Sequence, residues 1–535
     1  MAKKTFMKGA IVLGVAGIIV KVLGAFFRIP LANIIGDTGM GYYQTAYPIY
    51  VLLLTLSTAG IPTAIARLVS ERTAEGDHFE ANKIFKLSFK LMFIIGFVSC
   101  AILFFGASLF VKYTAAPEAV YAMKAIAPAL LFVPIMASFR GYFQGLQDMS
   151  PTATSQVYEQ LFRVVFGLGL AILLVKYGIP YAAAGASFGA TAGAVFGLIA
   201  IFIVYLRRRK SLQSDIANSV DCGHRESGRT ILKKIIVIAI PITIGAAIMP
   251  IMTSLDLVIV QNRLVEAGYT AEQANSLYGQ LSGFSAPLIN FPQVLTQSIA
   301  MSLVPAIAAA YQTKDMPFLQ HNVQLGLRTS MIIGLPCAVG LIVLAEPIMR
   351  LLYPSQIESA LNAAGCLAIL AFGVIFLSSV QTLTGILQGI GKQMIPVRNL
   401  AIGAVFKVVI TYILTGIPSL NVKGAAVGTV AAYVVASTLN LMAVKKYTGT
   451  KFNVSLTYIK PGISAAVMGA CVFFGYRVIF SIIESNSIST VISVGIGVVV
   501  YAVLMFAMGA ITDEELLLLP KGRKLAALAG KFRRK

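Results

Sequence analysis

The sequence has little charge and few of the side chains that carry out acid–base or metal chemistry. Only 12% of its 535 residues are charged, and it contains three histidines. Its cysteines show no paired spacing, so no disulfide or zinc framework is indicated. A phosphate-binding glycine loop, a dinucleotide fingerprint and an insertion large enough for an ATPase domain are also missing. These absences argue against an enzyme and leave an ion gradient, the membrane potential or a substrate gradient as the energy source of a transporter.

Long apolar runs dominate what is present. Hydrophobic residues make up 57% of the chain, and the mean hydropathy is +0.83. Runs of about twenty residues are long enough to cross a hydrocarbon core about 30 Å thick. The sequence therefore predicts an all-α polytopic membrane protein with about fourteen transmembrane helices. The expected spans are 9–34, 42–66, 87–111, 119–139, 152–175, 181–206, 235–262, 277–310, 329–345, 359–388, 399–416, 424–444, 461–480 and 488–511.

The positions of Lys and Arg predict the orientation. Most of the 43 lie in segments expected on one side, and cytoplasmic loops collect positive charge. Seven fall in segments expected on the outer side: Lys112, Lys124, Lys176, Arg263, Arg350, Lys423 and Arg477. This split places both termini in the cytoplasm. It also explains most of the net charge of +22 without a nucleic-acid partner, since basic runs such as "RRRK" at 207–210 can act as orientation signals beside bilayer lipids.

The second half of the chain repeats the first. "GYFQGLQDMSP" from Gly141 resembles "GILQGIGKQMIP" from Gly385, and "FRVV" at 162–165 matches "FKVV" at 406–409 at the same offset. Farther upstream, "PTAIA" at Pro62 resembles "PAIAA" at Pro305, at an offset that differs by one residue from that of the other matches. Each repeat holds six spans, an even number, so the two lobes should share one orientation and be related by an axis along the membrane normal. Two C-terminal helices lie outside this parallel pseudo-repeat.

The repeat gives a domain division. Residues 1–210 form a first lobe, 211–234 a basic cytoplasmic linker, 235–450 a second lobe, and 451–535 the last two helices and a basic cytoplasmic tail.

Four cations lie inside expected spans, where a charge costs on the order of 2.5–3.5 kcal/mol unless it faces a cavity or a partner. Lys21 and Arg28 are two helical turns apart and share a face, and Arg163 and Lys407 occupy matching repeat positions. A local ion pair from Glu159 to Arg163 is one alternative, and snorkelling of Arg28 to the interface is another. The surplus of cations favours an anionic substrate that carries phosphate. The predicted substrate site comprises Lys21, Arg28, Arg163, Lys407, Glu159, Gln144 and Gln388.

Two further motifs need an interpretation. Asp256 is a lone carboxylate in its span, which makes it a candidate for a coupling proton or sodium ion, with a hydrogen bond to a neighbouring helix as the alternative. "GASFG" at 185–189 matches the nucleophile motif of serine hydrolases, but it lies in an apolar span and no histidine lies in any expected span. Glycines at every fourth position from 185 to 197 instead predict close helix packing.

The order of motifs resembles a known superfamily. "MAKKTFMKGAIVLGVAGIIVKVLGAFFRIPLANIIG", followed by "GYYQTAYPIY" and "FQGLQDMSP", is similar to the stage V sporulation protein B and MurJ-like branch of the MATE-like (MOP) flippases. The resemblance implies two six-helix lobes and a cationic cavity that binds a polyprenyl pyrophosphate. Lys21 and Arg28 match family arginines, while two others are replaced by Gly60 and Pro287. Asp256 resembles a sodium-site acid, and the matching partners are Asn399 and Thr429.

The predicted function is therefore translocation of an undecaprenyl-pyrophosphate-linked glycan, a peptidoglycan precursor or a polysaccharide unit, across the bacterial plasma membrane. No bond is made or broken, no cofactor is needed beyond a Na⁺ or H⁺ coupling ion, and cell-wall synthesis enzymes are candidate partners. Two alternatives stay open: a MATE-type cation-coupled multidrug exporter, and a scaffold that recruits cell-wall enzymes through its basic loops.

Overall fold

The computed structural model describes residues 2–220 and 225–510, apart from the side chains of residues 2–11 and 18. All regular structure in these ranges is helical, which confirms the predicted fold class. The chain forms two compact units, Met1–Gly283 and Phe284–Lys535, and each is described by itself. The predicted basic tail after residue 510 lies outside the described residues.

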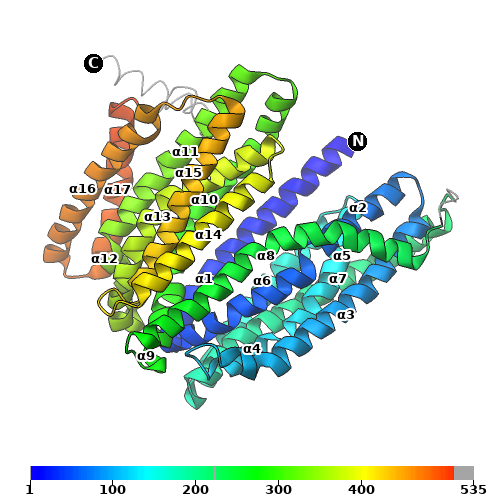
Figure 1. Ribbon diagram of the computed structural model, residues 1–535, viewed down its shortest axis with the longest axis horizontal. Coiled ribbons are helices and arrows are strands. Elements are labelled where there is room, and N and C mark those ends of the chain that lie inside the picture. Colours follow the sequence, from blue (N-terminus) through cyan, green and yellow to red (C-terminus); the bar gives the residue numbers. More distant parts are fainter. Residues whose placement is uncertain (1, 221–224, 511–535) are drawn as a thin grey trace. The chain divides into compact units, whose positions relative to one another are not determined.

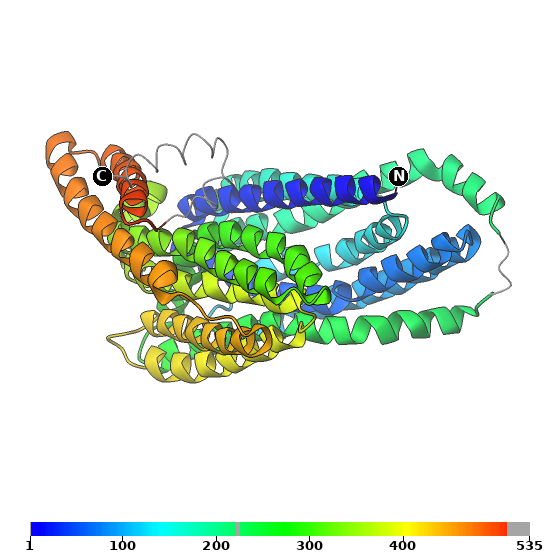
Figure 2. The ribbon, with the colours of Figure 1, turned by 90° about the horizontal axis from the view of Figure 1, so that it is seen from above.

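The described residues of the first unit form nine α-helices, whose arrangement can be followed in Figures 1 and 2. They are α1 (Ala2–Thr58), α2 (Ile61–Ala74), α3 (His78–Val111), α4 (Ala119–Ile126), α5 (Ala129–Gly145), α6 (Ser150–Leu174), α7 (Ile179–Ala217), α8 (Gly228–Glu266) and α9 (Ala271–Gly279), with a 3₁₀ turn η1 (Val175–Tyr177) and a π-helical turn η2 (Gln280–Ser285) at its end.

Helix α1 is two helices joined at Gly36, whose φ of 67° and ψ of −173° interrupt the helical backbone. Arg28 and Tyr47 would be roughly 28 Å apart in a straight helix at 1.5 Å per residue, yet the Arg28 Cζ lies 6.0 Å from the Tyr47 ring centroid. The chain therefore turns back on itself at Gly36. The carboxylate of the next residue, Asp37, holds this turn by accepting hydrogen bonds from Ser276 Oγ (2.7 Å) and Gln280 Nε2 (2.9 Å).

This turn accounts for the number of spans. Thirteen candidate spans occur in the described residues, and one of them, Val12–Ala74, runs for 63 residues. Because it contains the Gly36 turn and two of the predicted spans, it provides two crossings, and the expected number of about fourteen is recovered. The second predicted span, 42–66, is itself interrupted, since α1 ends at Thr58 and α2 begins at Ile61.

The glycines of α7 pack against α6, as predicted. A Cβ added at Gly189 would lie 2.6 Å from the Arg163 carbonyl oxygen, and one at Gly193 would lie 2.4 Å from the Glu159 carbonyl oxygen. Only hydrogen fits at these positions, so the two backbones approach closely. This contact fixes the part of α6 that carries Glu159 and Arg163.

Up to residue 510, the second unit contains eight α-helices, and in both views α16 runs beside α17 at one edge of it (Figures 1 and 2). They are α10 (Ala286–Gln312), α11 (Met316–Val343), α12 (Ala345–Leu352), α13 (Ile357–Gly389), α14 (Met394–Thr415), α15 (Lys423–Thr448), α16 (Lys460–Ile483) and α17 (Asn486–Ala507), with η3 (Pro354–Gln356) before α13 and the π-helical η4 (Ser455–Ile459) before α16.

The two units repeat the same internal contacts. A Cβ added at Gly141 would lie 2.8 Å from the Pro62 carbonyl oxygen, and a Cβ at the matching Gly385 would lie 2.8 Å from the Ala300 carbonyl oxygen. Pro62 thus corresponds to Ala300, and its predicted equivalence to Pro305 is wrong by five residues. The short "PTAIA" match was a coincidence of small and apolar residues, and the contacts fix the register.

The segment predicted as a linker is attached to the first unit. Helix α7 continues to Ala217, after which the Val220 N–H donates to the Gly76 carbonyl oxygen at 3.2 Å. Glu226 accepts hydrogen bonds from Arg72 on α2 and from Lys234 on α8, the latter at 2.6 Å. The compact unit accordingly extends through α8 and α9 to Gly283, beyond the lobe boundary expected from the repeat.

Candidate functional site

A row of tyrosines on the second half of α1 lies against two arginines of the first unit, Arg28 and Arg163. Tyr43, Tyr47 and Tyr50 recur at the i, i+4, i+7 spacing of one helical face. The Tyr43 and Tyr47 rings stack at 5.8 Å with 18° between their planes, and the Tyr50 centroid lies 6.0 Å from that of Tyr47. Arg28 Cζ lies 6.0 Å and Arg163 Cζ 5.4 Å from the Tyr47 ring centroid. Two guanidiniums therefore share one aromatic ring, each within cation–π distance.

The Arg163 guanidinium is only partly satisfied. Its Nη2 atom is buried and has no hydrogen-bond partner among the described residues. A buried donor without an acceptor costs about 1–3 kcal/mol, and more when it is charged. The arrangement favours any rearrangement or ligand that brings an acceptor to this nitrogen.

Glu159 does not form the predicted ion pair with Arg163. Its Oε2 accepts a hydrogen bond from Arg140 Nη2 at 2.9 Å, and Arg140 Nε donates to Ser155 Oγ at 2.8 Å. The i, i+4 spacing on α6 suggested the wrong partner because a residue from another helix, α5, reaches the carboxylate first. This region therefore contains three arginines, Arg28, Arg140 and Arg163, and the carboxylate of Glu159, so it has surplus positive charge.

Lys21 and Gln144 are the other predicted substrate-site residues of the first unit. Lys21 is exposed on the first half of α1. One turn farther along, a Cβ at Gly24 would lie 3.5 Å from Gln160 Nε2, so this stretch of α1 faces α6. Gln144, at the end of α5, points its amide to Thr152 Oγ1 at 3.4 Å. The structure therefore brings Arg28 and Arg163 together and gives Gln144 a separate polar partner.

The counterparts in the second unit are less enclosed. Lys407 is half-buried on α14, and Gln388 is exposed at the end of α13. A Cβ at Gly428 would lie 3.1 Å from the Lys407 carbonyl oxygen, just as Gly189 lies against the Arg163 carbonyl. Arg163 and Lys407 consequently occupy equivalent places in the two repeats, each fixed by a glycine of the following helix.

The candidate coupling-ion residues divide between the units. Asp256 is half-buried on α8 in the first unit. In the second unit Asn399 is 2% exposed and donates through Nδ2 to Asn440 Oδ1 at 2.9 Å. Thr429 Oγ1 donates to the Ala425 carbonyl oxygen at 3.0 Å. Asn399 and Thr429 thus already have partners within their own unit, and their role with Asp256 stays a prediction.

Gly60, where the resemblance leads one to expect an arginine, packs tightly against α8. A Cβ at this position would lie 2.2 Å from the carbonyl oxygen and 2.7 Å from the Cα of Ala239 on α8. No side chain fits against that backbone, so α8 occupies the space that a larger residue would need.

Sequence reasoning found Arg28 and Arg163 but missed the tyrosines and Arg140. The signal for the tyrosines was present in "GYYQTAYPIY", where three of them fall on one helical face. Arg140 falls one residue beyond the predicted span 119–139, whereas α5 continues to Gly145.

The family to which this sequence belongs follows from a comparison with family models. The chain belongs to the polysaccharide biosynthesis protein family, whose model matches residues 6–311, more than half of its length. A second family model, MatE, matches residues 282–413. With its long apolar helices, the protein is therefore a multi-pass membrane protein of the polysaccharide biosynthesis protein family.

Curated relatives support the assignment. Stage V sporulation protein B of Bacillus subtilis (strain 168) is 28% identical over 528 residues, which cover 97% of this chain and 98% of that protein. Lipid II flippase MurJ of the same organism is 27% identical over 460 residues, 84% of each chain.

Solved structures share the fold. A lipid II flippase MurJ in an inward closed conformation has a TM-score of 0.70 at 16% identity and covers 92% of this chain and 98% of its own. An inward-facing multidrug resistance MATE family transporter of the MOP superfamily has a TM-score of 0.68 at 17% identity, covering 80% and 94%.

Proposed function

We propose that this protein moves an anionic lipid-linked glycan, a polyprenyl pyrophosphate that carries a sugar unit, from the inner to the outer leaflet of the bacterial plasma membrane by alternating access. The observation that carries this proposal is the pairing of Arg28 and Arg163 on one tyrosine ring, with a buried guanidinium nitrogen that lacks an acceptor. The names of the relatives, a sporulation protein and a lipid II flippase, support a substrate of this class.

The chemistry of the substrate matches the charge of this region. A pyrophosphate presents several anionic oxygens, and arginine binds such groups through paired, charge-assisted hydrogen bonds. Tyr47 places both guanidiniums within cation–π distance of one ring, and Arg163 Nη2 has no acceptor among the described residues. In the proposed cycle the pyrophosphate draws Arg163 away from its partly satisfied resting place, while the polyprenyl tail stays in the bilayer.

The test is mass spectrometry of the lipids that co-purify with the full-length protein. Wild type should retain a polyprenyl-pyrophosphate glycan, and the Arg28→Gln, Arg163→Gln double variant should lose it at least tenfold, since each charge-assisted hydrogen bond contributes about 1.5–3 kcal/mol. Arg67→Gln is the matched control, because Arg67 is exposed on α2 and pairs with Glu71. Equal retention by the double variant and wild type would rule out this role for the two arginines.

A drug exporter is the second candidate, and the match to the MatE model favours it. In that function Asp256 would exchange a proton or sodium ion for an amphipathic cation. Ethidium efflux from cells that express the protein separates the two candidates. Efflux that Asp256→Asn abolishes would favour the exporter, whereas a flippase for anionic lipids gives no efflux with either form.

A further inference from the structure

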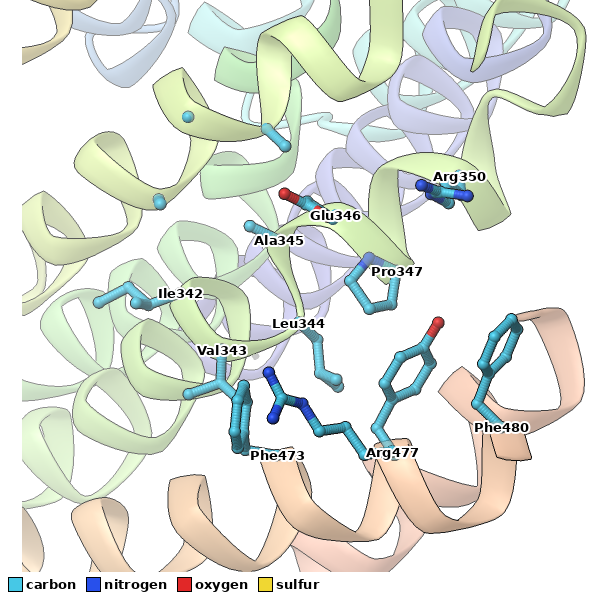
Figure 3. Close-up of a pocket in the computed structure, with 14 residues that line it drawn as sticks. Ile342, Val343, Leu344, Ala345, Glu346, Pro347, Arg350, Phe473, Arg477 and Phe480 are labelled. Carbon is cyan, nitrogen blue, oxygen red and sulfur yellow. The ribbon is translucent and has the colours of Figure 1, made fainter. Parts of the chain in front are cut away.

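The second unit contains a cavity of 550 Å³ between the end of α11, the short helix α12, and helices α13 and α16. Its walls are largely apolar. Figure 3 shows Ile342, Val343 and Leu344 on one side, with Phe473 and Phe480 on α16 facing them. Such a cavity, lined by apolar side chains with a few polar groups, is typical of a ligand site.

The charged groups at this cavity are mainly cations. Arg350 of α12 and Arg477 of α16 both line it, and Glu346 is the carboxylate among the lining residues. A third cation lies at the wall, because a Cβ added to Gly365 would lie 2.8 Å from Lys423 Cε and 3.3 Å from Nζ. The cavity therefore has a surplus of positive charge.

The two guanidiniums have donors to spare. Among the described residues, neither Arg350 nor Arg477 forms an ion pair or a side-chain hydrogen bond. Arg477 Cζ lies 4.2 Å from the Phe473 ring centroid, which holds one face of the guanidinium and leaves its edge open. In Figure 3 the Arg477 side chain extends from α16 toward Val343 and Leu344. A planar guanidinium presented in this way is suited to the oxygens of a phosphate.

The location of these cations is unusual for this chain. Arg350, Lys423 and Arg477 are three of the seven cations that the sequence places on the outer side. Basic residues are scarce on that side of a membrane protein. Arg350 of α12 and Arg477 of α16 line one cavity, and Lys423 of α15 lies beside Gly365 in its wall, which indicates a role other than orientation.

The walls of the cavity are tied together by a polar chain. The Tyr476 hydroxyl donates to Asn486 Oδ1 at 2.8 Å, and Asn486 Nδ2 donates to the Pro347 carbonyl oxygen at 3.1 Å. These bonds connect α16, α17 and α12, so the two arginines are carried by elements with a fixed separation.

We propose that this cavity binds the phosphate headgroup of an anionic phospholipid from the surrounding bilayer, with its acyl chains lying along α16. The phosphate would bind Arg350 and Arg477, with Lys423 close by. A lipid is favoured over a free anion because the walls are apolar and because Phe474, Val478 and Ile482 of α16 are exposed beside the site. The site lies in the second unit and is separate from the arginine pair on Tyr47.

Native mass spectrometry of the delipidated full-length protein, titrated with phosphatidylglycerol, tests this proposal. The Arg350→Gln, Arg477→Gln variant should bind at least tenfold more weakly than wild type, from the loss of two charge-assisted contacts. The matched control is Lys112→Gln with Lys176→Gln, two other predicted outer-side cations, and it should bind as wild type does. Equal loss in both double variants, or no loss in the arginine variant, would overturn the proposal.

The ligand source is tested on wild type alone, so the result does not depend on the folding of a variant. Diacylglycerol, which has the same chains without phosphate, should not compete with phosphatidylglycerol, and inorganic phosphate should compete only weakly. Competition by diacylglycerol as strong as that of phosphatidylglycerol would overturn the role of the phosphate. Full displacement by millimolar inorganic phosphate would overturn the lipid as the occupant.

Discussion

Tyr47 determines where the Arg28 and Arg163 guanidiniums lie. A guanidinium over an aromatic ring gains about 0.5–2 kcal/mol, depending on how far it is desolvated. Here Arg28 and Arg163 use one ring, so the aromatic face both attracts the two cations and limits where they can lie. The hydroxyl of Tyr47 is not needed for this effect, which allows the ring and the polar tip to be separated by substitution.

We predict that Tyr47→Leu lowers the free energy of unfolding by about 1–2 kcal/mol relative to Tyr47→Phe, because leucine removes the π face and phenylalanine keeps it. The measurement is the thermal unfolding midpoint of the purified protein in one detergent. Tyr177→Leu is the control, since the Tyr177 ring is exposed and lies over a single cation, Lys176, whose Nζ is 5.0 Å from its centroid. Identical midpoints for Tyr47→Leu and Tyr47→Phe would contradict the shared-ring account.

The residue scale also shows where sequence reasoning reaches its limit. Buried cations were identifiable from the cost of charge in an apolar span, and Arg28 and Arg163 do lie together. The partner of Glu159 was not identifiable, because spacing along α6 says nothing about Arg140 on α5. Side chains that meet through tertiary contacts can be inferred from sequence only when a repeat or a resemblance supplies the register.

At the scale of helices, close packing between α6 and α7 depends on glycine. We predict that Gly189→Ala destabilises the protein by about 1–3 kcal/mol, because the new Cβ would lie 2.6 Å from a backbone oxygen that cannot move independently. Gly169→Ala on α6 should instead stabilise by up to about 1 kcal/mol, since nothing lies within 4 Å of its Cβ position and alanine is the better helix former.

Unfolding midpoints of these two alanine variants, measured side by side, check the prediction. The pair makes the same chemical change on two helices that contact each other, so opposite signs isolate the packing effect. Equal and favourable shifts for both variants would mean that α7 has more room than the structure gives it.

The turn in α1 is a second element-scale feature. Gly36 has a φ of 67° and a ψ of −173°, a region that costs a residue with a side chain about 1–3 kcal/mol. We predict that Gly36→Ala loses that amount of stability, whereas Gly245→Ala, in an open helical position of α8, loses none. Chemical denaturation of both variants is the measurement, and a Gly36→Ala variant as stable as wild type would contradict the left-handed backbone at this turn.

On the scale of the whole molecule, hydropathy and the internal repeat were sufficient to predict the class of fold. The thickness of the bilayer sets the length of an apolar helix that crosses it, and the lack of water there requires a helical backbone. The spans could therefore be predicted from the sequence alone. The limits of the compact units could not, because they depend on which helices contact each other. Helices α8 and α9 pack on α1 and belong with the first unit, although the repeat groups them with the second.

Glu226, just before α8, forms hydrogen bonds with residues of α2, α3 and α8. Glu226 accepts from Arg72 and Lys234, and Lys83 Nζ donates to the Glu226 carbonyl oxygen at 2.5 Å. The hydrogen bond from Lys234 and the charge of Arg72 hold the pKa of the Glu226 carboxyl below its usual range. This side chain is 17% exposed and Arg72 is 14% exposed, so solvent only partly screens their interaction, while the pair with Lys234, which is 47% exposed, is screened more strongly.

A lowered carboxyl pKa makes a definite prediction about acid stability. The contribution of Glu226 is fully present above the unfolded-state value of about 4.3 and is lost as pH falls through its lower folded-state pKa. Glu226→Gln should therefore destabilise the protein at neutral pH by about 1–2 kcal/mol, and the difference from wild type should shrink toward zero below about pH 4. Unfolding midpoints between pH 3 and 7 measure this. Glu71→Gln, which breaks an exposed pair with Arg67, is the control and should change little at any pH. A Glu226→Gln deficit that stays constant across the range would show that the amide is tolerated poorly for its shape and that the carboxylate charge does not hold α2 and α8 together.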